Sequence, residues 1–227
     1  MIERSFTFAG IPLLTLAESA GPRAAVLFYH GLHSEKATHR KELDSLAARG
    51  FLAVGVDAVG HGERRIVDLS AFLNRDELMT QFTKLLRPSV EEVPLLVDYL
   101  ISEGHGPIGL AGISFGGMLA FGAAAREPRL AAAVAILGDP SWCRPDPAQY
   151  VGAPLFAWNG GRDQHVAPAG AREFVRELQQ LHPSGRFEYR EYPNSDHFME
   201  PNDWDDGWAR TLSWFEEHLK PRENNAL

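Results

Sequence analysis

The sequence predicts an α/β protein whose mostly parallel sheet of about eight strands is flanked by helices on both faces. Two observations predict this class. Short apolar runs, such as residues 24–29 and 108–113, are typical of strands that are buried on both faces. Segments with apolar residues at helical spacing, such as 169–181, separate these runs along the chain. Strands that alternate with helices are joined by crossovers, so most of them are expected to lie parallel.

The elements are expected in the following order. Residues 5–16 alternate apolar and polar side chains around a turn at Ala9-Gly10, which predicts an antiparallel hairpin. Ser34 is expected to cap a helix over 35–49. The other strands are expected at 24–29, 52–56, 108–113, 131–137, 154–159 and 186–192, and the other helices at 115–125, 169–181 and 205–219.

The length of the chain favours a single domain over residues 1–227, because 227 residues supply one substantial core. The formal net charge of −8 argues against nucleic acid and anionic membrane surfaces as partners. Cys143 is the single cysteine, so no intramolecular disulfide is expected. Neither a signal peptide nor an apolar run of membrane-spanning length is recognisable, so a cytoplasmic location is expected. The oligomeric state stays open.

Residues 64–101 are long for one crossover, and we expect two helical pieces there, about 76–86 and 89–102, broken or kinked near the prolines. This excursion leaves the carboxyl edge of the sheet, where open α/β sheets bind ligands. Its apolar residues could form a wall of the substrate site, or act as a lid: Ile66, Leu69, Phe72, Leu73 and Phe82. The other irregular stretch, 139–152, is too short for a large cap domain, so an open site is expected.

The segment Gly112-Ile113-Ser114-Phe115-Gly116 carries the clearest chemical signal. It follows an apolar strand and opens an Ala/Gly-rich helical run. Side chains at Gly112 and Gly116 would collide across such a sharp turn, so glycine is needed at both positions. The hydroxyl of Ser114 would stand clear at the start of a helix, whose free N–H groups could stabilise an oxyanion. Ser114 is therefore the predicted nucleophile.

A serine nucleophile needs a base and an acid that orients the base. Asp163 and His197 each follow a predicted strand, and the chain order of Ser114, Asp163 and His197 is that of nucleophile, acid and base in α/β hydrolases. Asp139, which follows the preceding strand, remains a rival acid. Asp196 is disfavoured, because neighbouring residues seldom bring their side chains together productively.

His30-Gly31-Leu32 stands at the end of another apolar strand. The N–H of Leu32 could join that of Phe115 as an oxyanion hole, with Gly31 permitting close approach and His30 holding the loop. The four histidines that could cluster in this region lack the tight spacing of a metal site: His30, His33, His39 and His61. No metal and no cofactor are expected.

On these residues the chain resembles serine hydrolases of the α/β-hydrolase superfamily, and it is most similar to small esterases related to dienelactone hydrolases and to the catalytic domains of prolyl-oligopeptidase-like enzymes. The resemblance extends over residues 11–219 and includes His30-Gly31, the turn at 57–62, the segment around Ser114, Asp163 and His197. Dienelactone hydrolases proper use a cysteine nucleophile. The serine at position 114 therefore implies ordinary serine ester hydrolysis.

The expected function is a serine carboxylester hydrolase that cleaves small or medium acyl esters through an acyl-enzyme intermediate. Its expected partner is a small-molecule ester. A thioesterase, a peptidase or an acyltransferase could use the same three residues, because this fold supports many reactions. A non-catalytic ligand-binding module is the alternative of another class, and an aligned base argues against it.

Overall fold

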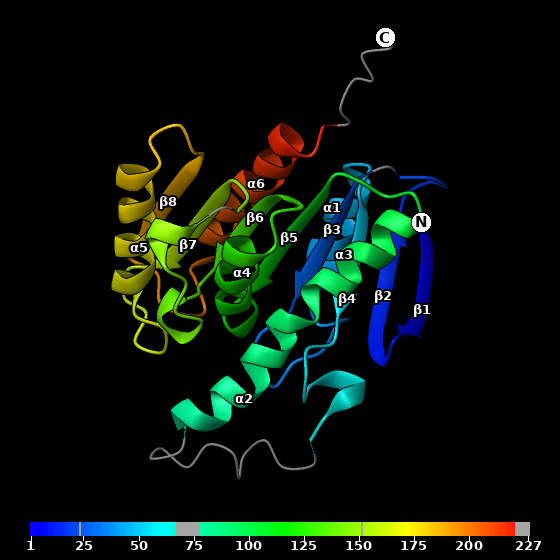
Figure 1. Cartoon of the computed structure of the whole chain (residues 1–227), viewed down its shortest axis with the longest axis horizontal. Coiled ribbons are helices and arrows are strands. Elements are labelled where there is room, and N and C mark those ends of the chain that lie inside the picture. Colours follow the sequence, from blue (N-terminus) through cyan, green and yellow to red (C-terminus); the bar gives the residue numbers. More distant parts are fainter. Residues whose placement is uncertain (23, 67–77, 151, 221–227) are drawn as a thin grey trace.

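The computed structural model describes residues 1–22, 24–66, 78–150 and 152–220. Its strands are β1 (Ile2–Phe8), β2 (Ile11–Ala17), β3 (Ala25–Tyr29), β4 (Leu52–Val56), β5 (Ile108–Ile113), β6 (Leu130–Ile136), β7 (Leu155–Gly160) and β8 (Phe187–Tyr192). Within the described chain they form one eight-stranded sheet in the order β1-β2-β4-β3-β5-β6-β7-β8 (Figure 1). The β1–β2 hairpin is antiparallel, as predicted, and so is the β2–β4 pair. The pairs from β4 to β8 are parallel, so the predicted fold class is confirmed.

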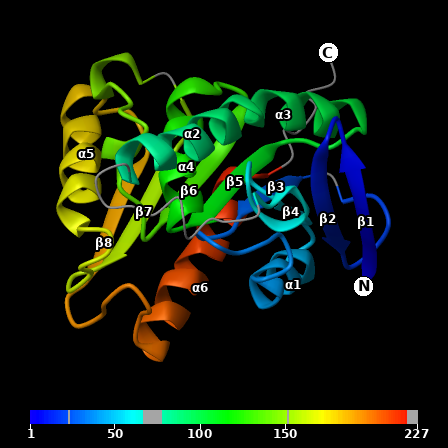
Figure 2. The same cartoon turned by 90° about the horizontal axis from the view of Figure 1, so that it is seen from below.

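Helices cover both faces of this sheet. One face carries α1 (Arg40–Ala48) and α6 (Pro201–His218), and the other carries α2 (Leu78–Glu91), α3 (Val93–Ser102), α4 (Phe115–Arg126) and α5 (Pro168–Leu181) (Figure 2). Each layer encloses its own apolar core. No helix in the described ranges is both long enough and apolar enough to cross a membrane.

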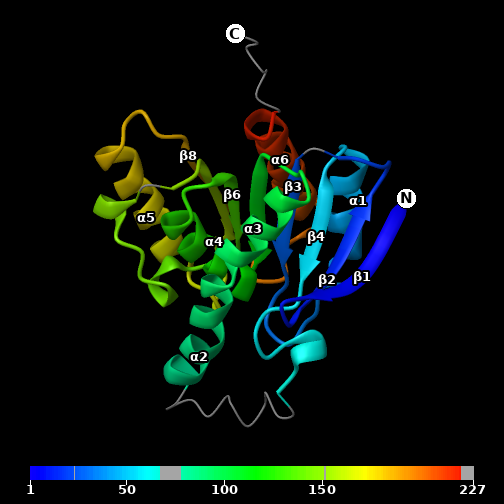
Figure 3. The ribbon, with the colours of Figure 1, turned by 45° about the vertical axis from the view of Figure 1, so that its right-hand side comes forward.

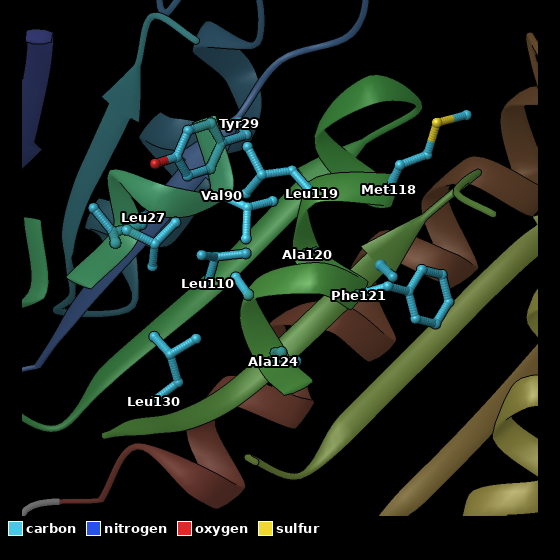
Figure 4. Packing of buried hydrophobic residues seen from close by; sticks show 14 of the residues in the cluster. Leu27, Tyr29, Val90, Leu110, Met118, Leu119, Ala120, Phe121, Ala124 and Leu130 are labelled. Atoms are coloured by element: carbon cyan, nitrogen blue, oxygen red, sulfur yellow. The ribbon is translucent and has the colours of Figure 1, made fainter. Parts of the chain in front are cut away.

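The central strands are apolar throughout because both of their faces are covered. Leu27 of β3 belongs to the core beneath α2–α5, whereas its neighbours Val26 and Phe28 belong to the core beneath α1 and α6. Figure 4 shows Leu27 and Leu110 beside Val90 of α2 in the first core. The continuous apolar runs of the sequence therefore correspond to alternating contributions to two cores.

The first and last helices, α1 and α6, begin elsewhere than predicted. The helix expected from residue 35 starts at Arg40, and its N-cap residue is His39 rather than the predicted Ser34. A local turn takes the earlier residues: the N–H of Thr38 donates to the Glu35 carbonyl at 3.0 Å, and the Glu35 N–H donates to Oγ1 of Thr38 at 3.2 Å. Such side-chain bonds compete with the helix. The last helix, α6, begins at Pro201, earlier than the predicted residue 205.

The excursion over 64–101 contains two helices, as predicted, and their break lies near the second of its two prolines, Pro94. α2 continues through Pro88, and the break lies at Glu92, just before α3. Pro94 lies in the first turn of α3, where a missing N–H costs no hydrogen bond. Three residues of the predicted wall lie outside the described residues: Leu69, Phe72 and Leu73.

The parallel strands end at one edge of the sheet. Figure 3 shows the arrowheads of β3 and β4 pointing towards the end of the molecule at which α2 begins. The short 3₁₀ helices η1 (Gly62–Arg64), η3 (Pro140–Trp142) and η4 (Pro147–Gln149) occupy loops beyond the described strands. This edge carries the residues that the sequence singled out for chemistry.

Candidate active site

Ser114 lies on the sharp turn between β5 and α4, with φ 55° and ψ −108°. A Cβ atom at Gly112 would lie 2.2 Å from the Gly116 carbonyl oxygen, and one at Gly116 would lie 2.3 Å from the Tyr29 carbonyl oxygen. Gly117, which the sequence analysis did not single out, is equally constrained, because its Cβ would lie 2.3 Å from the Ile136 carbonyl oxygen. The turn therefore needs three glycines, two of which were predicted.

The side chains of Ser114, His197 and Asp163 form one hydrogen-bonded chain. Nε2 of His197 lies 3.0 Å from Oγ of Ser114, and Nδ1 of His197 lies 2.6 Å from Oδ2 of Asp163. The other carboxylate oxygen, Oδ1, accepts the backbone N–H groups of His165 and Val166, both at 2.8 Å. Because the buried carboxylate is fixed by these bonds, it orients the imidazole so that Nδ1–H donates to Asp163 and Nε2 faces the serine.

The two other aspartates that the sequence offered are engaged elsewhere. Oδ1 of Asp139 accepts the backbone N–H of Ser141 at 2.9 Å and caps η3. Oδ1 of Asp196 accepts the backbone N–H of Phe198 at 2.8 Å. The structure therefore brings Asp163 to His197 and assigns both other carboxylates to local turns.

His30 holds the loop that follows β3. The backbone N–H of Ala58 donates to Nε2 of His30 at 3.2 Å, so the ring proton is on Nδ1, which lies 2.7 Å from the Gly31 carbonyl oxygen. The N–H of Leu32 belongs to the same planar peptide as that carbonyl and points the opposite way. Neither this N–H nor that of Phe115 has a hydrogen-bond partner among the described residues.

Burial keeps the histidines behind this loop neutral. Desolvation lowers the pKa of His30 to about 4, although its hydrogen bond to Gly31 acts in the opposite direction. His61, whose ring centroid lies 5.1 Å from that of His30, also has a lowered pKa because it is buried. A neutral His30 keeps its acceptor nitrogen for Ala58 and its donor for Gly31.

A partly buried ionic cluster ties this loop to the one after β4. Oδ1 of Asp57 accepts a hydrogen bond from the backbone N–H of Lys36 at 2.7 Å, and Oδ2 accepts one from the side-chain ammonium of Lys36 at 3.0 Å. Oδ2 also accepts the backbone N–H of Glu63 at 3.0 Å, and the ammonium donates to the Glu63 carboxylate. Burial opposes the charged form, but these hydrogen bonds raise the pKa of Lys36. Asp57 therefore stabilises its own turn and also reaches across to the neighbouring loop.

A cavity of about 590 Å³ opens beside Ser114 and His197. On the side of the α2–α5 layer it is lined by Phe82, Met118 and Trp142, and the ring centroids of Phe82 and Trp142 lie 4.5 Å apart. The side towards α1 and α6 carries Ser34, His39 and Trp204. Phe82 is therefore a cavity wall, as predicted for the excursion, whereas Ile66 does not line the cavity.

Within the described parts of the chain, no group of three or more His, Cys, Asp or Glu side chains is arranged to hold a metal ion. The nearby pair His30 and His61 instead bonds to backbone groups of the surrounding loops.

The site geometry can be set beside known proteins. The model of the dienelactone hydrolase family matches residues 13–219. YitV of Bacillus subtilis (strain 168), named as a candidate esterase, is 26% identical over 260 residues, which cover 94% of this chain and 97% of YitV. Esterase YjfP of Escherichia coli (strain K12) is 29% identical over 194 residues, covering 80% of this chain and 74% of YjfP. The crystal structure of TT1662 from Thermus thermophilus aligns with a TM-score of 0.82 at 25% identity, covering 98% of this chain and 100% of TT1662.

Proposed function

Because the chain belongs to the dienelactone hydrolase family, we propose that it is a serine carboxylester hydrolase in which Ser114, His197 and Asp163 carry the reaction. The family and the esterase relatives make the protein a hydrolase of the carboxylesterase type. The observation that carries the finer proposal is the hydrogen-bonded chain from Oγ of Ser114 through His197 to Asp163. A merely structural serine would not need a histidine whose far nitrogen is held by a buried carboxylate.

In the first half of the reaction, Nε2 of His197 takes the proton of Ser114 as Oγ attacks the ester carbonyl. Negative charge then develops on the carbonyl oxygen, and the unpartnered N–H groups of Leu32 and Phe115 would stabilise it. His197 passes its proton to the leaving alcohol, which leaves an acyl group on Ser114. Asp163 stabilises the cationic imidazolium and keeps its orientation throughout.

In the second half, water takes the place of the alcohol. His197 deprotonates that water, the resulting oxygen attacks the acyl carbonyl, and the same two N–H groups stabilise the second oxyanion. The acid is released as His197 returns the proton to Oγ of Ser114. Dienelactone hydrolases proper use a cysteine at the nucleophile position, so the serine here favours simple esters over dienelactone.

The proposed substrates are small-molecule esters with short to medium acyl groups. The apolar side of the cavity, which Phe82, Met118 and Trp142 line, supplies a site for such a group. The net charge of −8 disfavours nucleic acid and anionic membrane surfaces as partners. The proposed site of action is the cytoplasm.

Two assays test this function: labelling by a fluorophosphonate probe, and hydrolysis of p-nitrophenyl butyrate. The wild-type protein is expected to be labelled on Ser114 and to hydrolyse the ester. The Ser114→Ala variant should lose labelling and lose turnover by a factor on the order of 10⁴ or more. Near-wild-type turnover by that variant, with contaminating esterases excluded, would refute the mechanism. Parallel assays with a butyryl thioester and a p-nitroanilide distinguish an esterase from a thioesterase or peptidase.

A further inference from the structure

The side of the active-site cavity that faces α1 and α6 differs in chemistry from its other side. Ser34 and His39 contribute a hydroxyl and an imidazole there, and Trp204 contributes an indole. All three are partly buried, so they lie in the cavity wall rather than on an open surface. We refer to Ser34, His39 and Trp204 as the polar wall.

Glu42 supports this wall from behind. Oε2 of Glu42 lies 3.7 Å from Nδ1 of His39, and the Glu42 carboxylate also interacts with the side chain of Trp204. Burial alone would raise the pKa of Glu42, but its contacts with His39 and Trp204 hold the pKa below its ordinary value. One carboxylate therefore contacts two cavity-lining rings from distant parts of the sequence, His39 just before α1 and Trp204 in α6.

The polar wall keeps hydrogen-bonding capacity that the protein does not use. Because Nδ1 of His39 faces Glu42, its other nitrogen, Nε2, is left for a ligand, and no described residue bonds to it. The same holds for Oγ of Ser34 within the described residues. The indole of Trp204 makes a T-shaped contact with Trp158, with 5.4 Å between the ring centroids, so its ring is held by the protein while it lines the cavity.

The scissile carbon of an ester bonded to Ser114 must lie between the two walls. The acyl group and the alcohol group extend from that carbon in different directions, so each can occupy one side. The apolar side, with Phe82, Met118 and Trp142, suits a hydrocarbon acyl group. The polar wall combines an aromatic surface with unpaired donors and acceptors, which suits a compact group with both C–H faces and hydroxyls.

We propose that the enzyme cleaves esters of hydroxylated alcohols, such as a polyol or a monosaccharide, whose carbon skeleton lies against Trp204 and whose hydroxyls bond to His39 and Ser34. Glu42 acts as a positioning residue for this recognition. The proposal rests on the proposed ester hydrolysis at Ser114 and specifies its alcohol part.

Matched butyrate esters test the proposal by pH-stat titration. Propyl butyrate and 1-butyrylglycerol share an acyl group and a three-carbon alcohol, and differ in two hydroxyls. The wild-type enzyme is expected to prefer 1-butyrylglycerol by about tenfold or more in kcat/KM, since one or two net hydrogen bonds correspond to such a factor. 6-O-Butyrylglucose, compared with hexyl butyrate, shows whether the wall selects a polyol or a sugar ring.

The variants His39→Phe, Ser34→Ala and Glu42→Gln are expected to reduce this preference by several-fold each. The loss should appear mainly in KM for the hydroxylated ester, because these bonds form in the ground state as well as in the transition state. Rates are counted per serine labelled by fluorophosphonate, so that partly unfolded variants are compared correctly. Glu18→Gln, the same change at an exposed position, is the matched control.

The outcomes separate the two proposals. Equal kcat/KM values for the matched esters, or variants that keep the wild-type preference, would overturn the hydroxylated-alcohol proposal while ester hydrolysis stands. Absence of both fluorophosphonate labelling and p-nitrophenyl butyrate hydrolysis would overturn the ester hydrolysis itself. Preference for the hydroxylated ester that is reduced several-fold in each of the three variants supports the assignment.

Discussion

Asp163 bonds to His197 through one carboxylate oxygen while two backbone N–H groups hold the other oxygen. Asparagine at this position would keep the shape of the side chain but would present an amide to Nδ1 and favour the wrong imidazole tautomer. Turnover of p-nitrophenyl butyrate by Asp163→Asn should therefore fall by ~10⁴. Asp139→Asn is the matched control and should stay within a few-fold of wild type, because Asp139 caps η3. The reverse ranking would show that Asp139 is the acid.

His30 makes stability depend on pH. Its pKa is lowered from 6.5 to about 4 in the folded protein because it is buried, so between these values the unfolded chain binds more protons. Its contribution is therefore fully present above about pH 6.5 and is lost as the pH falls towards 4, by at most about 3 kcal/mol. In His30→Asn, urea unfolding should show a smaller loss of stability between pH 7 and pH 4.5 than in the wild type.

The control for this measurement is His33→Asn. His33 is exposed and has φ 62°, a conformation that asparagine tolerates. This variant should keep the pH dependence of the wild type. Identical pH dependence in His30→Asn and wild type would mean that His30 does not control acid stability, and that other groups such as His61 do.

α2 brings Phe82 to the apolar side of the cavity, where its ring centroid lies 4.5 Å from that of Trp142. Wild-type kcat/KM for p-nitrophenyl esters is expected to reach a maximum at short to medium acyl chains and then decline. Phe82→Ala should move that maximum to longer chains, because it removes a wall and each methylene then buried adds about 0.8 kcal/mol. Stability should fall by about 3–5 kcal/mol at this largely buried position, which urea unfolding measures separately. A steady rise with chain length in the wild type would instead mean that the excursion acts as a lid.

The strands could be predicted from the sequence better than the starts of α1 and α6. A strand that is buried on both faces, such as β5, must be apolar throughout, and the predicted range 108–113 is the observed one. A helix start depends on which local hydrogen bonds compete with the first turn. The Glu35–Thr38 turn delays α1 in a way that apolar spacing does not report.

In the candidate site, too, some residues could be predicted from the sequence and others could not. Ser114, Asp163 and His197 follow strands, and the parallel sheet brings the ends of its strands to one edge, so their meeting could be expected from chain order. Glu42 could not be predicted, because its contact with Trp204 joins α1 to α6, and no sequence pattern shows which residues of two distant helices meet. The outer residues of the predicted wall lie in 67–77, outside the described residues.

At the scale of the whole molecule, the cavity lies where the two helix layers meet at the carboxyl edge of the sheet. Phe82 and Met118 come from the layer of α2 and α4, and Trp204 comes from the layer of α6. Each layer packs on its own core, so one wall of the cavity can be changed with little disturbance of the other. The effects of substituting Phe82 and Glu42 are therefore expected to be additive in activation free energy, so that the fold-changes in kcat/KM multiply.

The backbone conformation of Ser114 reflects selection for function rather than for stability. At φ 55° and ψ −108° a residue with a side chain is strained by about 1–3 kcal/mol, whereas glycine accepts this conformation. Ser114→Gly should therefore unfold at a higher urea concentration than the equally inactive Ser114→Ala. The expected difference in the free energy of unfolding is about 1 kcal/mol, after the greater chain entropy of glycine is subtracted. A lower midpoint for the glycine variant would show that the turn is relaxed. Selection for turnover thus opposes selection for stability at this position, and a lineage that no longer needed the reaction would be expected to drift towards glycine here.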